Sequence, residues 1–171
     1  MSPTSTLGTV APYHLFSYSI LFGSTVYQSF FVGITAFRAL SRPQFSALQR
    51  KVFPPYFAMQ TLIPGLLALT APFPILENQL VLYTLAITSL TALVNLVYFG
   101  PWTVKIMTMR KAQETKEDKK YYEADVSADM KKLNKEFGMV HGISTIFNLG
   151  TLIASAVYGF ILAGAITRGF A

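Results

Sequence analysis

FVGITAFRALSRPQFSALQRKVFPPYF, residues Phe31–Phe57, is the stretch that decides the fold. Its apolar start ends at Arg38, a short basic segment follows, and the chain is apolar again from Phe53. Two apolar segments joined by a short basic turn are typical of two membrane-spanning helices connected at one face of a bilayer. The stretch therefore predicts a helical hairpin in a membrane.

The rest of the chain has the composition of a membrane protein. Of 171 residues, 52% are hydrophobic and 13% are charged, whereas soluble domains average about 25% charged residues; the mean hydropathy is +0.43. Four stretches contain no Asp, Glu, Lys or Arg: Tyr13–Phe37, Val52–Leu76, Asn78–Val104 and Phe137–Thr167. A helix needs roughly 20 residues to cross the hydrocarbon core, and each stretch is long enough.

These stretches predict an all-α fold, because a backbone in lipid must form its own hydrogen bonds. We expect an integral membrane four-helix bundle with a kinked second helix. The whole chain, 1–171, is then one transmembrane domain with spans at about 13–37, 55–71, 79–104 and 138–165. The charged segment 105–136 connects the last two spans and is expected to extend both helices into solvent, with a mobile middle.

The distribution of charge predicts the orientation. Four of the 14 Lys and Arg residues lie between Arg38 and Lys51, nine lie between Lys105 and Lys135, and Arg168 is the remaining one. With four spans both basic connections face the same side, which the positive-inside rule assigns to the cytoplasm. We therefore expect both termini on the opposite side of an endomembrane or organellar membrane. The long connection also carries seven of the eight acids, so a nucleic-acid partner is not expected.

The chain lacks cysteine, and it lacks Lys and Arg before the first span; both absences bear on its function and processing. The chain has no cysteine, which excludes disulfides, thiolate metal sites and cysteine nucleophiles. No Lys or Arg precedes the first span, so that span lacks the charged start of a signal peptide and is expected to stay as an anchor.

The first hairpin and the second span contain two unusual features. Ser41 and Gln44 have the spacing of a capping box, which favours a short interfacial helix with Arg42, Arg50 and Lys51 in water; a plain polar turn is the alternative. Pro64, followed by Gly65, removes the donor to the Gln60 carbonyl. The resulting kink is either a packing feature or, as in interrupted transporter helices, a binding site.

Polar side chains on the other spans predict a polar interior. Polar side chains share one face of the helix in the first, third and fourth spans. Amide side chains come from all four helices and are not all at one depth: Gln28, Gln60, Asn95 and Asn148. Such side chains either hold helices together or line a ligand site. We expect His14, His141 and Ser144 to be buried structural groups, and Arg38, Arg42, Arg50 and Lys51 to lie at the membrane interface.

Neither metal chemistry nor catalysis is expected. His14 and His141 begin spans at opposite sides of the membrane, so they cannot share one haem iron, and a lone histidine without Cys or carboxylate partners is a poor metal site. No acid lies within a span, which disfavours proton-coupled transport. No Ser-His-Asp or paired-carboxylate pattern stands out. We expect no enzyme activity, no cofactor and no metal.

Two blocks of the chain resemble a known family. The first comprises His14-Leu15, Gly33, Phe37-Arg38, Pro43, Phe45, Leu48-Gln49, Phe53-Pro54 and Tyr56-Phe57; the second comprises Gly100-Pro101-Trp102-Thr103, Leu133-Asn134, Phe137, His141-Gly142, Ser144 and Asn148-Leu149-Gly150. Together they resemble the transmembrane protein 205-like family of four-span membrane proteins, whose domain has no known function. The resemblance implies the fold and topology above and no chemistry. Where some members carry a histidine, this chain has Ala58.

Two functions remain. The first is a structural, interaction or assembly component, with the polar side chains as internal ties. The second is binding or transport of a lipid or neutral amphiphile, with Gln28, Gln60, Pro64, Asn95 and Asn148 as candidate ligand-binding residues. Membrane lipids are expected partners in both cases, and other membrane proteins or a second copy of the chain are possible partners.

Overall fold

Four long helical segments account for most of the computed structural model, which describes residues 6–71, 74 and 78–169. The first consists of α2 (Ala11–Tyr27), the π-helical turn η1 (Gln28–Val32) and α3 (Gly33–Ala39). The second is α4 (Arg42–Thr70). The third consists of α5 (Gln79–Val94), the π-helical turn η2 (Asn95–Phe99) and α6 (Gly100–Glu117), and the fourth is α7 (Ala128–Gly169).

All four segments are long and apolar enough to cross a membrane, and no strand occurs in the described residues. The prediction of an all-α protein with four such helices is therefore confirmed. The third and fourth segments span 39 and 42 residues, about 60 Å at 1.5 Å per residue. This length exceeds the hydrocarbon core of about 30 Å, so their charged ends extend beyond it.

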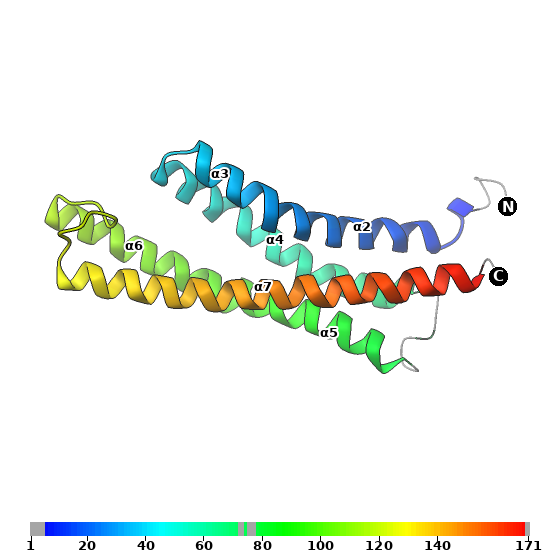
Figure 1. Ribbon diagram of the computed structural model, residues 1–171. Helices are drawn as coiled ribbons and strands as arrows, with labels where there is room; N and C mark the ends of the chain where they lie inside the picture. The colour runs from blue at the N-terminus through cyan, green and yellow to red at the C-terminus, as the bar shows by residue number, and fades with distance from the viewer. Residues whose placement is uncertain (1–5, 72–73, 75–77, 170–171) are drawn as a thin grey trace.

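The segments run back and forth along one axis (Figure 1). The α3–α4 and α6–α7 connections lie at one end of the molecule, and the start of α2 lies at the other end with the end of α7. In sequence order each segment packs against the next through α2–α4, α4–α5, and the α5–α7 and α6–α7 pairs. The first segment also contacts α7.

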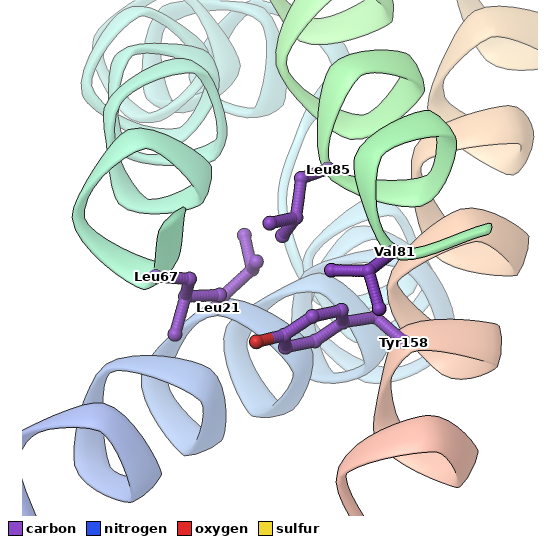
Figure 2. Packing of buried hydrophobic residues seen from close by; sticks show 5 residues of the cluster. All are labelled: Leu21, Leu67, Val81, Leu85 and Tyr158. Atoms are coloured by element: carbon purple, nitrogen blue, oxygen red, sulfur yellow. The ribbon is translucent and has the colours of Figure 1, made fainter. Parts of the chain in front are cut away.

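One apolar cluster joins all four segments near the end where the chain starts. Leu21 of α2, Leu67 of α4, Val81 and Leu85 of α5, and Tyr158 of α7 converge there (Figure 2). A second cluster around Phe99, Ile106 and Val140 joins only the third and fourth segments. Outward-facing residues are also apolar, with Leu69 87% and Phe160 81% exposed, as expected for helices surrounded by lipid.

The second segment differs from the sequence expectation. Instead of a short interfacial helix before a span starting near residue 55, α4 runs unbroken from Arg42 to Thr70. Its start is the predicted capping box, in which Gln44 Oε1 accepts from the Ser41 N–H at 3.2 Å. Pro54 and Pro55 deprive the Arg50 and Lys51 carbonyls of their helical donors, and both of these residues are exposed.

The connection between α6 and α7 is shorter than the sequence predicts, and side chains of α6 contact it. Residues 118–127 link α6 to α7, and Asp118 ends α6 in the left-handed conformation, φ 52°. Glu114 Oε1 accepts from the Tyr121 N–H at 3.1 Å, and the Arg110 guanidinium lies 3.7 Å from the Tyr121 ring centroid. Buried Met130 completes a small core, so the connection folds back onto the helices.

Candidate functional site

Asn148, halfway along α7, forms side-chain hydrogen bonds with three residues, of which Gln60 is one of the predicted polar side chains. Its Oδ1 accepts from the Tyr56 hydroxyl at 2.9 Å and from Gln60 Nε2 at 3.4 Å. Its Nδ2 donates to Ser29 Oγ at 3.1 Å. One amide therefore connects the first, second and fourth segments.

Gln60 lies next to Asn148 and is fully buried. Its Nε2 also donates to Thr25 Oγ1 at 2.9 Å, and the Thr25 hydroxyl donates to the Leu21 carbonyl at 2.7 Å. Gln60 Oε1 has no hydrogen-bond donor among the described residues. An unpaired buried acceptor costs about 1–3 kcal/mol, so a donor placed against this atom would be stabilising.

Gln28 and Asn95 each open a π-helical turn, η1 and η2 respectively. Gln28 Nε2 donates to Gln49 Oε1 of α4 at 3.4 Å. Asn95 is fully buried, its Nδ2 donates to the Ser144 carbonyl at 3.1 Å, and its Oδ1 has no donor among the described residues. Neither amide bonds to the Asn148 group directly, so the candidate residues form three separate inter-helix ties.

Pro64 is buried within the continuous α4. One turn earlier, the Thr61 carbonyl accepts from the Ser89 hydroxyl of α5 at 2.8 Å. The Ser89 hydroxyl thus bonds the carbonyl next to that of Gln60, from which Pro64 removes the helical donor. The bend expected at Ile63–Gly65 stays a prediction.

His14 ties three segments at the other end of the interior. Its Nδ1 lies 2.9 Å from Thr70 Oγ1, and its Nε2 lies 2.9 Å from the Tyr158 hydroxyl. The single Thr70 hydroxyl proton goes to the Leu66 carbonyl at 2.8 Å, so Thr70 must accept from the histidine. This assigns the proton to Nδ1 and makes Tyr158 the donor to Nε2.

His141 corrects the sequence prediction. We expected a buried group, but its side chain is exposed on α7, with its ring stacked on Phe137 at 5.6 Å between centroids. Ser144 is half-buried and takes part through its backbone carbonyl, the acceptor for Asn95. Among the described residues, no three His, Cys, Asp or Glu side chains come together as metal ligands would.

The predicted interface cations are all exposed at one end of the molecule: Arg38, Arg42, Arg50 and Lys51. Arg42 lies 4.3 Å above the Phe37 ring. An apolar groove of about 340 Å³ lies on the adjoining helix surface and not beside Pro64. Its lining is Tyr27, Phe31, Val32, Thr35, Ala36, Ala39 and Leu40.

Sequence reasoning did not single out several partners in these ties. Tyr56 and Gln49 enter the sequence analysis only as residues of the family resemblance. Thr70 and Tyr158 are not among the residues that the sequence predicts to be functional or buried. A tyrosine deep within an apolar span was the available signal, because its hydroxyl requires a partner once it is buried. Helix wheels could not show which polar groups would meet, since that depends on the depth and rotation of each helix.

Comparison with known proteins adds a family and one relative. Residues 16–112 match the family described as "Domain of unknown function (DUF4149)". "Xanthocillin biosynthesis cluster protein D" of Aspergillus fumigatus is 30% identical over 168 residues, covering 96% of each chain. No solved structure matches. The likeness to the transmembrane protein 205-like family stays a resemblance. The match over more than half of the chain and the full-length relative show that this protein belongs to the DUF4149 family.

Proposed function

We propose that this multi-pass membrane protein is a non-enzymatic structural or assembly component of an endomembrane or organellar membrane. The observation that carries the proposal is the use of the interior polar groups. Asn148, Gln60 and His14 bond to side chains of neighbouring helices, as groups that hold a scaffold together would. In this proposal the interior gives rigidity, and the outer faces contact other proteins.

The most suitable outer face for a partner helix lies on α7. Gly138 and Gly142 are four residues apart and exposed, and a Cβ at either position would meet no atom within 4 Å. Small residues at this spacing let a second transmembrane helix approach closely.

Purification of the tagged full-length chain after crosslinking, with quantitative mass spectrometry, tests this proposal. Leucine at Gly138 and Gly142 should reduce recovery of specific membrane partners at least about tenfold by blocking the close approach. Gly23→Leu is the matched control, because Gly23 is also exposed with open space around its Cβ. Unchanged recovery in the double variant, or a wild-type chain that purifies alone, would contradict the proposal.

Binding of a neutral amphiphile is the second candidate. It is favoured by Gln60 Oε1 and Asn95 Oδ1, two buried acceptors that have no donor among the described residues and that a ligand hydroxyl could satisfy. Gln60 lies one turn before Pro64, so Pro64→Ala should change the local backbone and release a co-purifying amphiphile while the fold persists. Unchanged lipid content in Pro64→Ala would count against this function and leave the scaffold proposal standing.

A further inference from the structure

The first connection carries positive charge that nothing in the neighbouring sequence balances. Arg38, Arg42, Arg50 and Lys51 are all exposed, and no Asp or Glu precedes Glu77 in the chain. Four cations therefore crowd one end of the first two helical segments without an acidic neighbour along the sequence. Such a patch attracts an external anion.

The charged segment 105–136 comprises the end of α6, the α6–α7 connection and the start of α7, and it differs from the first connection. Its nine cations are accompanied by seven acids, and several of the cations are engaged internally. Lys111 Nζ pairs with Glu114 at 3.1 Å, and Lys119 Nζ donates to the Asp125 carbonyl at 3.0 Å. The segment 105–136 therefore has a net charge of +2 (nine cations minus seven acids), whereas residues 38–51 carry four cations and no acid. The larger excess of positive charge at this end belongs to the α3–α4 corner.

The apolar groove lies on the helix that leads into this patch. Large side chains at Tyr27, Phe31 and Leu40 border smaller ones at Ala36 and Ala39, and the groove runs along η1 and α3. From Tyr27 to Leu40 the helix rises about 20 Å at 1.5 Å per residue. One leaflet contributes about half of the roughly 30 Å hydrocarbon core, so the groove is long enough to reach from the headgroup level to the membrane midplane.

The exposed cations and the apolar groove together favour one kind of ligand. A free anion would use the cations and leave the groove empty, and a neutral lipid would use the groove and leave the cations unpaired. A molecule with an anionic head and an apolar tail fits both features at once. Arginine binds phosphate oxygens with paired N–H donors, and the ring of Phe37 beneath Arg42 holds that side chain at the turn.

We propose that the α3–α4 corner is a binding site for an anionic phospholipid, with its phosphate on Arg38 and Arg42 and one acyl chain in the groove along η1 and α3. Arg50 and Lys51 add to the attraction from the first turns of α4. This site is on the lipid-facing surface, separate from the interior ties and from the Gly138–Gly142 face.

Native mass spectrometry of the detergent-solubilised full-length chain, titrated with phosphatidylserine and phosphatidylcholine of the same acyl chains, tests the charge requirement. The wild type should prefer phosphatidylserine, and Arg38→Gln with Arg42→Gln should weaken its binding about tenfold, since each surface cation contributes to anionic-lipid attraction. Lys131→Gln with Lys132→Gln is the control, because those cations are exposed in the first turns of α7, and its preference should be unchanged. Equal losses in both double variants would overturn a defined site.

A second arm tests the groove. Ala36→Phe fills it and should weaken phosphatidylserine binding about tenfold, whereas Ala163→Phe, on an exposed position of α7, should not. Glycerophosphoserine, the same headgroup without tails, should fail to compete at equal concentration. Retained binding in Ala36→Phe, or full competition by the tail-free headgroup, would show attraction by charge alone and overturn the proposal. Circular dichroism of each variant confirms that the helices are intact.

Discussion

Two glycines on α7 illustrate how single residues in this protein serve different purposes. Gly159 is half-buried, and a Cβ there would collide with the Tyr18 hydroxyl of α2. Gly142 is exposed, and a Cβ there would meet nothing within 4 Å. The first glycine permits close approach of two helices within the chain, and the second leaves an outer face open.

Alanine at these two positions should therefore have opposite effects. Gly159→Ala forces the Tyr18 ring or the helices to move, and we expect it to lower the free energy of unfolding by about 1–3 kcal/mol. Gly142→Ala should raise that free energy by about 0.5–1 kcal/mol, because alanine loses less conformational freedom in a helix. Denaturation in detergent micelles measures both, and an equal effect at the two sites would contradict the packing.

Histidine shows what could be predicted at this scale. His14 begins an apolar span, and its burial with two hydrogen-bond partners agrees with the sequence analysis. On a helical wheel His141 shares one face with Ser144 and Asn148, but its side chain is exposed in the structure. A helix wheel ranks faces within one helix, whereas burial depends on which face the neighbouring helices cover.

The helical segments combine regular spans with two π-helical turns. In each turn a glycine N–H donates to a carbonyl five residues earlier: Gly33 to Gln28 and Gly100 to Asn95. The Gly100 turn directly precedes Pro101, whose ring would otherwise meet the carbonyl of Val97. Each extra residue rotates the helix that follows, and the first residues of both turns are amides that bond to another segment.

Alanine at Gly100 tests whether the second turn depends on the missing side chain. A Cβ there would lie 2.8 Å from the Asn95 carbonyl oxygen, whereas one at Gly33 would lie 3.4 Å from that of Gln28. Gly100→Ala should therefore lower the unfolding free energy by about 1–3 kcal/mol, and Gly33→Ala should be close to neutral. A Gly100→Ala protein as stable as Gly33→Ala would show that the turn tolerates a side chain.

Hydrophobicity predicted the number and type of the helices but not where they begin and end. Sequence rules treat Pro54 and Pro55 as helix breakers, yet both lie within the second segment. The helix tolerates them because the residues whose carbonyls lose a helical donor, Arg50 and Lys51, are exposed. The many charges of the segment 105–136 predicted that it extends into solvent with a mobile middle. Met130, Leu133 and Phe137 have helical spacing and pack inward, a signal that the charges concealed.

At the scale of the whole molecule, the two basic connections lie at one end (Figure 1). We predict that this end faces the cytoplasm, because thirteen of the 14 Lys and Arg residues lie in the segments 38–51 and 105–135 around these connections and the positive-inside rule retains them there. In sealed microsomes a tag within residues 115–123 should be cut by added protease, and a tag at residue 1 should be protected. A protected loop tag with accessible termini would reverse the orientation.

The central claim is that the polar interior holds the helices together, and Asn148→Leu tests it most directly. The substitution removes bonds to Ser29, Tyr56 and Gln60. At about 0.6 kcal/mol for each inter-helix bond in a membrane, unfolding in detergent should become easier by about 1–2 kcal/mol, with membrane insertion and extracted small-molecule content unchanged. Unchanged stability, together with loss of a defined small molecule that co-purifies with the wild type, would contradict the claim and make this interior a ligand site.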